Sequence, residues 1–514
     1  MAATAARATI TLDAPGHTIS RHLYGHFAEH LGRCVYGGFW VGEDSDIPHE
    51  GGIRLDIVEA LRALNIPNLR WPGGCFADDY HWRDGVGPRE SRPRTINSEW
   101  GDIVENNHFG THEFMTLCEL LGAEPYVNGN VGSGTVREMS EWVEYLTRDG
   151  VSPMASLRRE NGREDPWRVP FWGIGNEPWG CGGNMRVDAY IDLARQYSTY
   201  CRNQDGNRLY RIAAGARDDD YSWTESMMKA MGPLDPGGTR AYADAISFHY
   251  YTAFGEWRTK KSATEFSTDD YYRTMVNAAR IDEIIRRHAA VMDVYDPGKR
   301  VGLVLDEWGT WWSQEPGSAP RSLYQQNTMR DALVAAVHFD AFHRHADRLV
   351  MANIAQTVNV LQAMVLTDPE SGALVLTPTY HVFAMNTDHH DARFLDVRLD
   401  APDSRVAVGD GSVLQTLSVS ASTNGRTATI SLTNLDAESE ASVLLDLRGR
   451  AVTGYSARIL TAPSLQSHNS AGAPDVVAVR AHGVVDSEEG AAFGRGLRVS
   501  LPPHSYVTVS LTLD

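Results

Sequence analysis

The chain has 514 residues, of which 42% are hydrophobic and 22% charged, a composition typical of a soluble globular protein with one large and one smaller domain. Its formal net charge of −19 disfavours nucleic acid and anionic membrane as partners and suits a neutral substrate. No stretch is apolar enough to span a membrane, and the N-terminus lacks the basic flank and apolar run of a secretory signal, so a cytoplasmic location is expected.

The five cysteines predict neither a disulfide framework nor a zinc site, because their number is odd and no two form a C-x-x-C pair. Reduced thiols in a cytosol are the expected state. Two clusters contain metal-ligating residue types, Glu29 with His26 and His30, and residues 388–391. Neither has the ligand spacing of a metal centre, so we expect no metal and no cofactor.

Residues 7–13 alternate like a half-exposed strand, and after them apolar strands alternate with amphipathic helices. Strands are expected at 23–28, 66–71, 124–128, 171–176, 211–215, 245–249, 301–306 and 348–355. Helices are expected at 53–64, 111–121, 135–147, 188–203, 270–294 and 325–345. This alternation predicts parallel crossovers, and eight such strands close a barrel rather than leave an open sheet.

The pattern changes near residue 390, where short alternating strands replace the helices. They are expected at 406–408, 414–420, 428–433, 443–447, 497–501 and 506–513, with a hairpin turn at Asn424-Gly425 and a loop over 463–495. The predicted fold class is therefore α/β: a (β/α)8 TIM barrel with a C-terminal antiparallel, jelly-roll-like β-sandwich that includes the N-terminal strand. The expected boundaries are 1–18 for that strand, 19–388 for the barrel and 389–514 for the sandwich.

Two glutamates end two of the predicted barrel strands. Glu177 follows the apolar run 171–176, and Glu307 follows the strand 301–306. TIM barrels carry their chemistry at the carboxyl ends of the strands, so the two side chains would face each other across the mouth. Glycoside hydrolysis needs such a pair, one acid to protonate the leaving oxygen and a second carboxylate to attack or to activate water. Asn176, beside Glu177, could hold a sugar hydroxyl.

Aromatic side chains crowd the same strand ends, where ring faces could stack on the C–H faces of a sugar. We expect about half of them to be core residues instead. They are Trp71, Trp179, His249, Tyr250, Tyr251, Trp308, Trp311 and Trp312.

Several longer motifs make the chain resemble family 51 glycoside hydrolases, the α-L-arabinofuranosidases. These are GHFAEHLG at 25–32, RWPGG at 70–74, GNEPW at 175–179, HYY at 249–251, DEW at 306–308, AQTVNV at 355–360 and PPHS at 502–505. They span nearly the whole chain in the family's order. The tripeptide Asn-Glu-Pro alone is shared by many related barrels, whereas the full set is specific.

The resemblance implies that Glu177 is the general acid/base and Glu307 the nucleophile. It also implies the residues around the sugar: Glu29, Asn176 and Gln356 on furanose hydroxyls, Tyr251 near the nucleophile, Arg70 on the nucleophile's carboxylate, Trp311 beside the sugar, and His249. Many members carry an Asn that bonds arabinose where this chain has Cys75, and a thiol is a weaker partner. Members are often intracellular hexamers, so a homo-hexamer is expected.

The resulting hypothesis is an exo-acting, retaining α-L-arabinofuranosidase that releases terminal arabinofuranose from the side chains of arabinan or arabinoxylan oligosaccharides. The alternative is an endo-acting β-glucanase or xylanase on the same barrel, which would need a long open cleft. The bulky loop at about 78–108 favours a closed pocket and exo action. A sugar-binding protein that had lost catalysis would lack a glutamate, and both are present.

Overall fold

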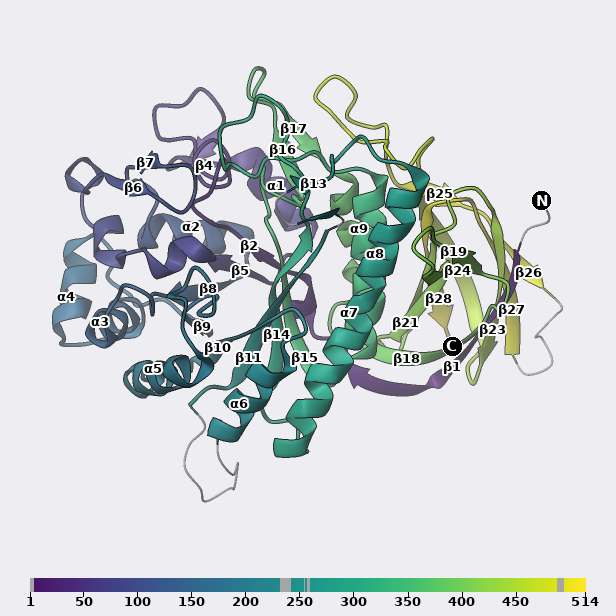
Figure 1. The fold of residues 1–514 in the computed structure, drawn as a ribbon, viewed down its shortest axis with the longest axis horizontal. Helices are drawn as coiled ribbons and strands as arrows, with labels where there is room; N and C mark the ends of the chain where they lie inside the picture. The colour runs from purple at the N-terminus through teal and green to yellow at the C-terminus, as the bar shows by residue number, and fades with distance from the viewer. Residues whose placement is uncertain (1–3, 232–241, 254, 257–258, 488–493) are drawn as a thin grey trace.

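The computed structural model describes residues 4–231, 242–253, 255–256, 259–487 and 494–514. Within them, eight parallel strands close a barrel in the order β10-β11-β14-β15-β2-β5-β8-β9, which confirms the predicted TIM barrel. The barrel strands are β2 (Gly25–Phe27), β5 (Asn68–Trp71), β8 (Glu124–Gly129), β9 (Phe171–Ile174), β10 (Tyr210–Arg217), β11 (Ala245–Thr252), β14 (Gly302–Thr310) and β15 (Leu349–Ile354). Figure 1 shows the barrel beside a second, strand-rich unit.

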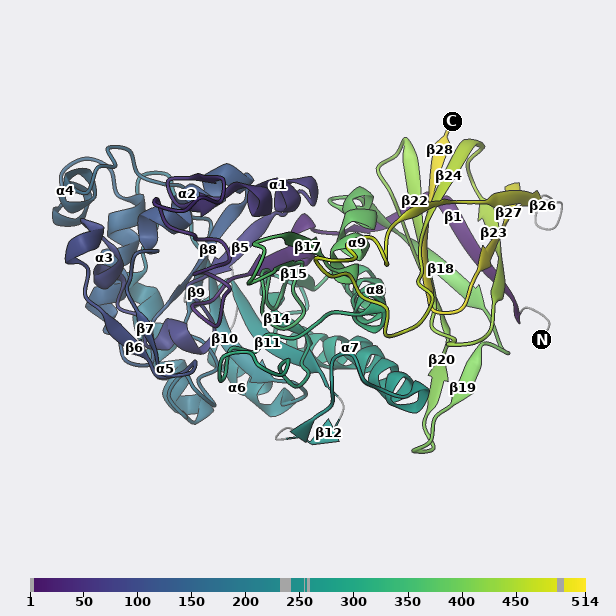
Figure 2. The ribbon, with the colours of Figure 1, turned by 90° about the horizontal axis from the view of Figure 1, so that it is seen from above.

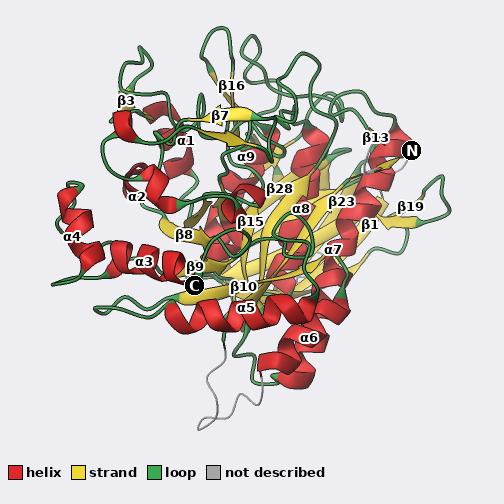
Figure 3. Cartoon of the chain, turned by 60° about the vertical axis from the view of Figure 1, so that its left-hand side comes forward, coloured by secondary structure: helices red, strands yellow, loops and turns green. Residues whose placement is uncertain are grey.

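Helices flank the barrel strands, as Figure 3 shows in red. They are α1 (Leu55–Ala63), α2 (Thr111–Leu121), α3 (Val136–Thr147), α4 (Pro153–Glu160), α5 (Val187–Tyr200), α6 (Tyr221–Met231), α7 (Thr268–Tyr295), α8 (Met329–Arg344) and α9 (Pro378–Met385). The pattern did not predict α4, α6 or α9. Helices α4 and α9 begin at Pro153 and Pro378, and proline is favourable in the first turn of a helix although it stops one elsewhere. In the described part of the chain, no helix combines the length and apolar character needed to cross a membrane.

The second unit is one folded sheet of ten strands, in the order β25-β24-β28-β22-β21-β18-β1-β23-β27-β26. Its strands are β1 (Thr4–Thr18), β18 (Arg393–Asp400), β21 (Leu417–Thr423), β22 (Thr427–Asn434), β23 (Ala441–Arg448), β24 (Val452–Leu460), β25 (Arg480–His482), β26 (Val484–Ser487), β27 (Gly494–Leu501) and β28 (Ser505–Leu513). The N-terminal strand β1 joins this sheet as predicted. It pairs antiparallel with β18 but parallel with β23, so the sheet is mostly rather than wholly antiparallel.

Several strand predictions for this unit need correction. Strands β18 and β24 were not expected, and β25 and β26 lie inside the predicted loop 463–495, of which residues 488–493 fall outside the described part. The expected strand 406–408 is β19 (Arg405–Ala407), which pairs with β20 (Val413–Gln415) in a separate hairpin. The expected single strand 414–420 is therefore wrong, because its residues divide between β20 and β21. Strand β24 contains Gly454 and an irregular run of exposed and buried residues, so it lacks the strict alternation that identifies a strand.

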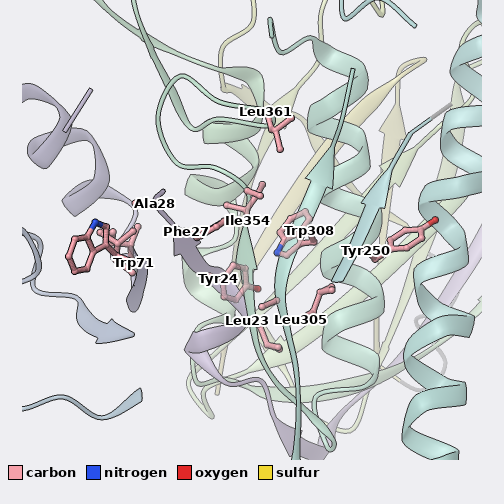
Figure 4. Packing of buried hydrophobic residues seen from close by; sticks show 14 of the residues in the cluster. Leu23, Tyr24, Phe27, Ala28, Trp71, Tyr250, Leu305, Trp308, Ile354 and Leu361 are labelled. Carbon is pink, nitrogen blue, oxygen red and sulfur yellow. The ribbon is translucent and has the colours of Figure 1, made fainter. Parts of the chain in front are cut away.

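Helix α8 lies between the two units. Every residue from Met329 to His343 is buried, as expected for a helix enclosed on all sides. Figure 2 shows α8 and α9 between the barrel strands and the folded sheet. On the barrel side, Trp308 of β14 packs edge-on against Phe339 and Phe342 of α8, and Figure 4 shows it beside the other core residues. This packing fixes β14, the strand that carries Glu307.

Candidate active site

Glu177 lies in a sharp turn after its strand, whereas Glu307 lies within β14, which runs to Thr310 and so extends past the predicted strand end at 306. Gly175 and Glu177, just after β9, have positive φ angles of 78° and 37°, so the chain leaves the strand at once and presents the Glu177 side chain at the mouth. In β14 the register with β11 shifts, because Leu305 pairs with Phe248 whereas Glu307 pairs with His249. Asp306 is the extra residue of this bulge, and a bulge re-aims neighbouring side chains.

Glu177 and Glu307 meet over one site, as the sequence predicted. One ligand atom each of Glu177, His249 and Glu307 lie within 4.8 Å of one another. His249 donates from Nδ1 to Oε1 of Glu177 at 2.8 Å, and the same nitrogen is 3.6 Å from Oε2 of Glu307. Strands β9, β11 and β14, far apart in the chain, therefore bring both carboxyl groups and an imidazole together.

Glu307 is held on both of its carboxylate oxygens. Arg70 donates to Oε1 at 2.9 Å and Tyr251 donates its hydroxyl to Oε2 at 2.8 Å. Arg70 also donates to Oδ1 of Asn176 at 2.6 Å, so one buried guanidinium orients residues at two strand ends. A Cβ at Gly74 would lie 2.7 Å from Oε1 of Glu307, which explains why glycine stands where the neighbouring loop passes the carboxylate.

Glu29 forms a second polar group of the site. Its Oε1 accepts from the Phe76 amide at 3.1 Å and from the Trp100 indole at 2.9 Å, and its Oε2 accepts from Gln356 at 2.6 Å. Trp100 was not predicted. It lies in the loop between β6 (Thr95–Asn97) and β7 (Ile103–Glu105), where no apolar periodicity marks it.

One pocket contains most of the predicted site residues. Seven of the ten line it, and the other three, Arg70, Asn176 and His249, are buried beside it with hydrogen bonds to the glutamates or to each other. The lining also includes apolar residues that the sequence did not indicate. The pocket is lined by Glu29, Leu31, Gly74, Cys75, Trp100, Glu177, Tyr251, Glu307, Trp311, Leu323, Gln356 and Leu361.

The predicted aromatic residues divide between site and core. Tyr251 and Trp311 line the pocket with their rings edge to face at 5.0 Å, and His249 contacts both glutamates. Partly buried Trp179 donates its indole N–H to the Gly215 carbonyl at 3.0 Å. The remaining four are buried core side chains: Trp71, Tyr250, Trp308 and Trp312.

Burial and charge shift the pKa values of the acidic groups. Burial raises the pKa of Glu177 above its ordinary value, and the negative charge of Glu307 acts in the same direction, while the hydrogen bond from His249 opposes both. Burial, followed by the charge of Glu307, also raises the pKa of Glu29, to about 7. Glu177 therefore holds a proton at a higher pH than a free glutamate does, as a general acid requires.

His249 lies between acidic groups on both sides of its ring. Besides its Glu177 contact, Nε2 donates to Oδ1 of Asp306 at 3.1 Å. Burial alone would lower the pKa of His249, but the charges of Glu307, Asp306 and Glu177 outweigh it and raise the pKa to about 10. Burial opposes ionisation of Asp306, but Arg70 and His249 lower its pKa to about 2. The site therefore contains an imidazolium.

Cys75 and Cys181 form a disulfide, with their Cα atoms 5.5 Å apart. The expectation that all five cysteines are reduced is thus wrong, and Cys34, Cys118 and Cys201 are the free ones. Cys75 has no thiol to offer a sugar. The pair joins the loops after β5 and β9, and Cys181 Sγ is 3.6 Å from Oε2 of Glu177. Both cysteines directly follow a glycine at a strand exit, a signal that could have suggested their proximity.

The donor atoms at the mouth suit sugar better than a metal. The group Cys75, Glu177 and Cys181 has a suitable spacing, but its sulfurs are bonded to each other. In the group Glu177, His249 and Glu307, both imidazole nitrogens already face carboxylate oxygens, Nδ1 that of Glu177 and Nε2 that of Asp306.

Comparison with known proteins gives consistent matches along the chain. The family models of the α-L-arabinofuranosidase 1 domain and the α-L-arabinofuranosidase C-terminal domain match residues 60–253 and 306–505. An intracellular exo-α-L-arabinofuranosidase of Bacteroides ovatus is 49% identical over 507 residues, covering 98% of this chain and 95% of the relative.

Solved structures agree. A family 51 arabinofuranosidase from Xanthomonas axonopodis pv. citri superposes with a TM-score of 0.94 at 45% identity, covering 99% of this chain and 100% of the other. An α-L-arabinofuranosidase from Thermotoga maritima, solved as an arabinose complex, gives 0.84 at 29% identity over 99% and 100% of the two chains.

A pair of carboxyl groups at the mouth of a (β/α)8 barrel, in a pocket lined by aromatic and polar side chains, is typical of a glycoside hydrolase. Within that class, the sequence identity to two arabinofuranosidases over nearly the full length of the chain is specific for one family. The chain belongs to the α-L-arabinofuranosidases of glycoside hydrolase family 51, which confirms the resemblance drawn from the motifs.

Proposed function

We propose that this protein is an exo-acting, retaining α-L-arabinofuranosidase that releases terminal non-reducing arabinofuranose from arabino-oligosaccharides. The observation that carries the proposal is the carboxyl pair at the mouth, with one oxygen each of Glu177 and Glu307 within 4.8 Å. Retaining enzymes place the two carboxyl groups about 5–5.5 Å apart, whereas inverting enzymes leave roughly 6.5–9.5 Å for a water molecule. The short separation supports double displacement.

In the first step, Glu307 attacks the anomeric carbon while Glu177 protonates the departing oxygen. Hydrogen bonds from Arg70 and Tyr251 aim the Glu307 carboxylate. His249 binds Oε1 of Glu177, which leaves Oε2 to carry the proton. The raised pKa of Glu177 keeps this proton in place, and activity should fall as the pH rises through that pKa.

In the second step, Glu177 is a carboxylate and takes a proton from water, which attacks the covalent arabinosyl-Glu307 intermediate. The bond between the sugar and Glu307 breaks, and arabinose leaves with its original anomeric configuration. The charge of the intermediate differs from that of the free site, because Glu307 is neutral as an ester. Burial still raises the pKa of Glu177, but the further rise caused by the charge of Glu307 is then removed, which suits its change from acid to base.

The remaining residues bind the furanose. Glu29, Asn176 and Gln356 present carboxylate and amide groups to the sugar hydroxyls, and Trp311 borders the ring. Exo action is supported by the β6–β7 hairpin, which places Trp100 on Glu29, so one side of the pocket is closed. The Bacteroides ovatus relative is also named as an exo enzyme. An endo-acting glucanase or xylanase would need an open cleft along that side.

We further propose a cytoplasmic homo-hexamer, from the family resemblance and from a relative named as intracellular. A disulfide is unusual in a reducing cytosol. Titrating the thiols of this protein from rapidly quenched cell extract would therefore show whether Cys75 and Cys181 are bonded in the cell. Sedimentation at six times the mass of one chain is expected, and a monomer would refute the assembly.

Two substrates test the mechanism. Glu177→Ala should keep kcat/KM on an aryl arabinofuranoside with a good leaving group, which needs no proton, and lose activity on an arabino-oligosaccharide. Its kcat on the aryl substrate should be low, because release of the intermediate lacks a base. Added azide should restore turnover in this variant, because it replaces the water that Glu177 activates. Glu307→Ala should lose both activities, and Glu59→Ala, on the exposed face of α1, serves as control. Full activity of Glu177→Ala on the oligosaccharide would contradict the proposal.

A further inference from the structure

Asp78 is a buried carboxylate below the mouth that accepts three backbone N–H groups. Its Oδ1 accepts from Val131 at 2.7 Å and from Gly132 at 2.9 Å, and its Oδ2 accepts from Asn176 at 2.8 Å. The residue itself is only 6% exposed. It ends the short 3-10 helix Cys75–Asp78 that follows β5.

These three amides belong to the exits of two further barrel strands. Val131 and Gly132 follow β8, and Asn176 follows β9. One carboxylate thus joins the loops after β5, β8 and β9. Asn176 directly precedes Glu177, so the amide that Asp78 fixes belongs to the same turn that aims the acid/base candidate.

The loop that carries Glu177 packs directly on this carboxylate. A Cβ at Gly182 would lie 2.7 Å from Oδ2 of Asp78, and a Cβ at Gly132 would lie 2.8 Å from its Cβ. Glycine at both positions allows the backbone to approach this closely. The loops therefore leave Asp78 almost no room to adopt another rotamer.

The backbone amides offset part of the cost of burying the charge of Asp78. Burial raises its pKa, to about 7, while the N–H groups of Gly132, Val131 and Asn176 each oppose that rise more than the charge of Arg70 does. An asparagine could offer one acceptor oxygen with two lone pairs to Val131 and Gly132. Its NH2 group would then face the third N–H, and two donors repel.

We infer that Asp78 is a positioning residue for the proposed arabinofuranosidase reaction, on which this inference rests: its carboxylate fixes the Asn176-Glu177 turn and thereby the direction in which Glu177 delivers its proton. Asp78 does not line the pocket and is not assigned a contact with substrate. It acts through the backbone of Asn176.

The test compares Asp78→Asn with the matched control Asp79→Asn, since Asp79 is the adjacent but exposed aspartate. The substrates are aryl arabinofuranosides whose leaving groups differ in pKa. With Glu177 misaligned, kcat/KM, which reports the first displacement, should fall about 10- to 100-fold for poor leaving groups. It should change less than threefold for the best ones, because these depart without a proton. Asp79→Asn should match the wild type on all substrates.

A second variant covers the case in which Asp78→Asn does not fold. Gly132→Ala keeps the carboxylate but crowds it, and it should give the same dependence on leaving group with a smaller loss. An equal loss of kcat/KM on every substrate would mean a merely structural role and overturn the inference, as would no loss at all. A wild-type protein inactive on every arabinofuranoside would refute the proposed function together with the inference. An active wild type with unaffected variants would refute the inference alone.

Discussion

Two buried histidines of this protein have opposite protonation states. His249 lies at the barrel mouth and His389 lies where the barrel meets the folded sheet, and neither is more than 5% exposed. The pKa of His249 is raised to about 10, whereas burial lowers the pKa of His389 to about 3.

The neighbours account for the difference. His389 donates to or accepts from the hydroxyls of Ser422 and Ser431 at 2.7 and 2.8 Å, and its ring lies 4.7 Å from that of His343. Hydroxyls satisfy a neutral imidazole without favouring its charge. His249 instead contacts the carboxyl groups of Glu177 and Asp306. Desolvation is common to both, so the adjacent charge decides the sign of the shift.

The largest expected effect comes from removing Glu307. In Glu307→Ala, hydrolysis should fall by about 10⁴-fold or more, because the nucleophile is lost. The pKa of His249 should also fall, because Glu307 is the largest of the charges that raise it. NMR titration of the imidazole resonances measures this second effect. An unchanged His249 pKa would show that the charge of Glu307 does not account for the difference between His249 and His389.

The disulfide cross-links two loops at the mouth of the barrel. Reduction of the Cys75–Cys181 bond with dithiothreitol should lower the free energy of unfolding by about 2–4 kcal/mol, because the unfolded chain loses a long-range cross-link. Chemical denaturation measures the change. The double variant Cys75→Ser, Cys181→Ser should not respond to the reductant. If dithiothreitol still destabilised the double variant, the loss of stability would not come from this disulfide.

His389, where the barrel meets the folded sheet, should make the fold sensitive to acid. The folded-state pKa of His389, about 3, lies below the value of about 6.5 in the unfolded chain. The unfolded chain therefore binds the proton first as the pH falls, and stability is lost from about pH 6.5 downward.

Between pH 7 and pH 4, the wild type should lose roughly 3 kcal/mol more stability than His389→Gln, which cannot titrate there. Urea denaturation at several pH values measures the difference. His81→Gln provides the control, because the His81 side chain is 47% exposed. Parallel pH profiles of wild type and His389→Gln would contradict the assignment of a neutral, buried His389.

The smallest of these effects is expected for Asp306→Asn, which keeps the shape of the site but removes one charge beside His249. The pKa of His249 should fall while Glu177 and Glu307 keep it above that of a free histidine. Activity should fall about 10- to 100-fold, the equivalent of about 1.4–2.7 kcal/mol for one charge-assisted hydrogen bond. A variant with full activity would show that Asp306 has no part in orienting the imidazole.

The barrel and its glutamates could be predicted because their signals are local. Each buried strand is an apolar run that ends at Gly, Pro or a polar residue. This pattern places Glu177 just past β9 and Glu307 near the end of β14, although β14 continues to Thr310. The bulge at Asp306 could not be predicted, because it arises from the register between β14 and β11 rather than from composition.

The missed features depend on which loops meet. Cys75 and Cys181 are separated by 106 residues, and their pairing follows from the barrel bringing the exits of β5 and β9 together. Trp100 reaches Glu29 because its hairpin is anchored at both ends. Asn97 donates to the His30 carbonyl at 2.6 Å, and Glu105 accepts from the His30 ring at 2.8 Å. No periodicity in residues 95–105 encodes these contacts.

The stereochemistry of the first product tests the central claim most directly. Proton NMR recorded within the first turnovers of an aryl α-L-arabinofuranoside, before mutarotation, should show α-L-arabinofuranose, because two displacements at the anomeric carbon restore its configuration. The β-anomer appearing first would mean a single displacement by water, and Glu307 would then not be the nucleophile.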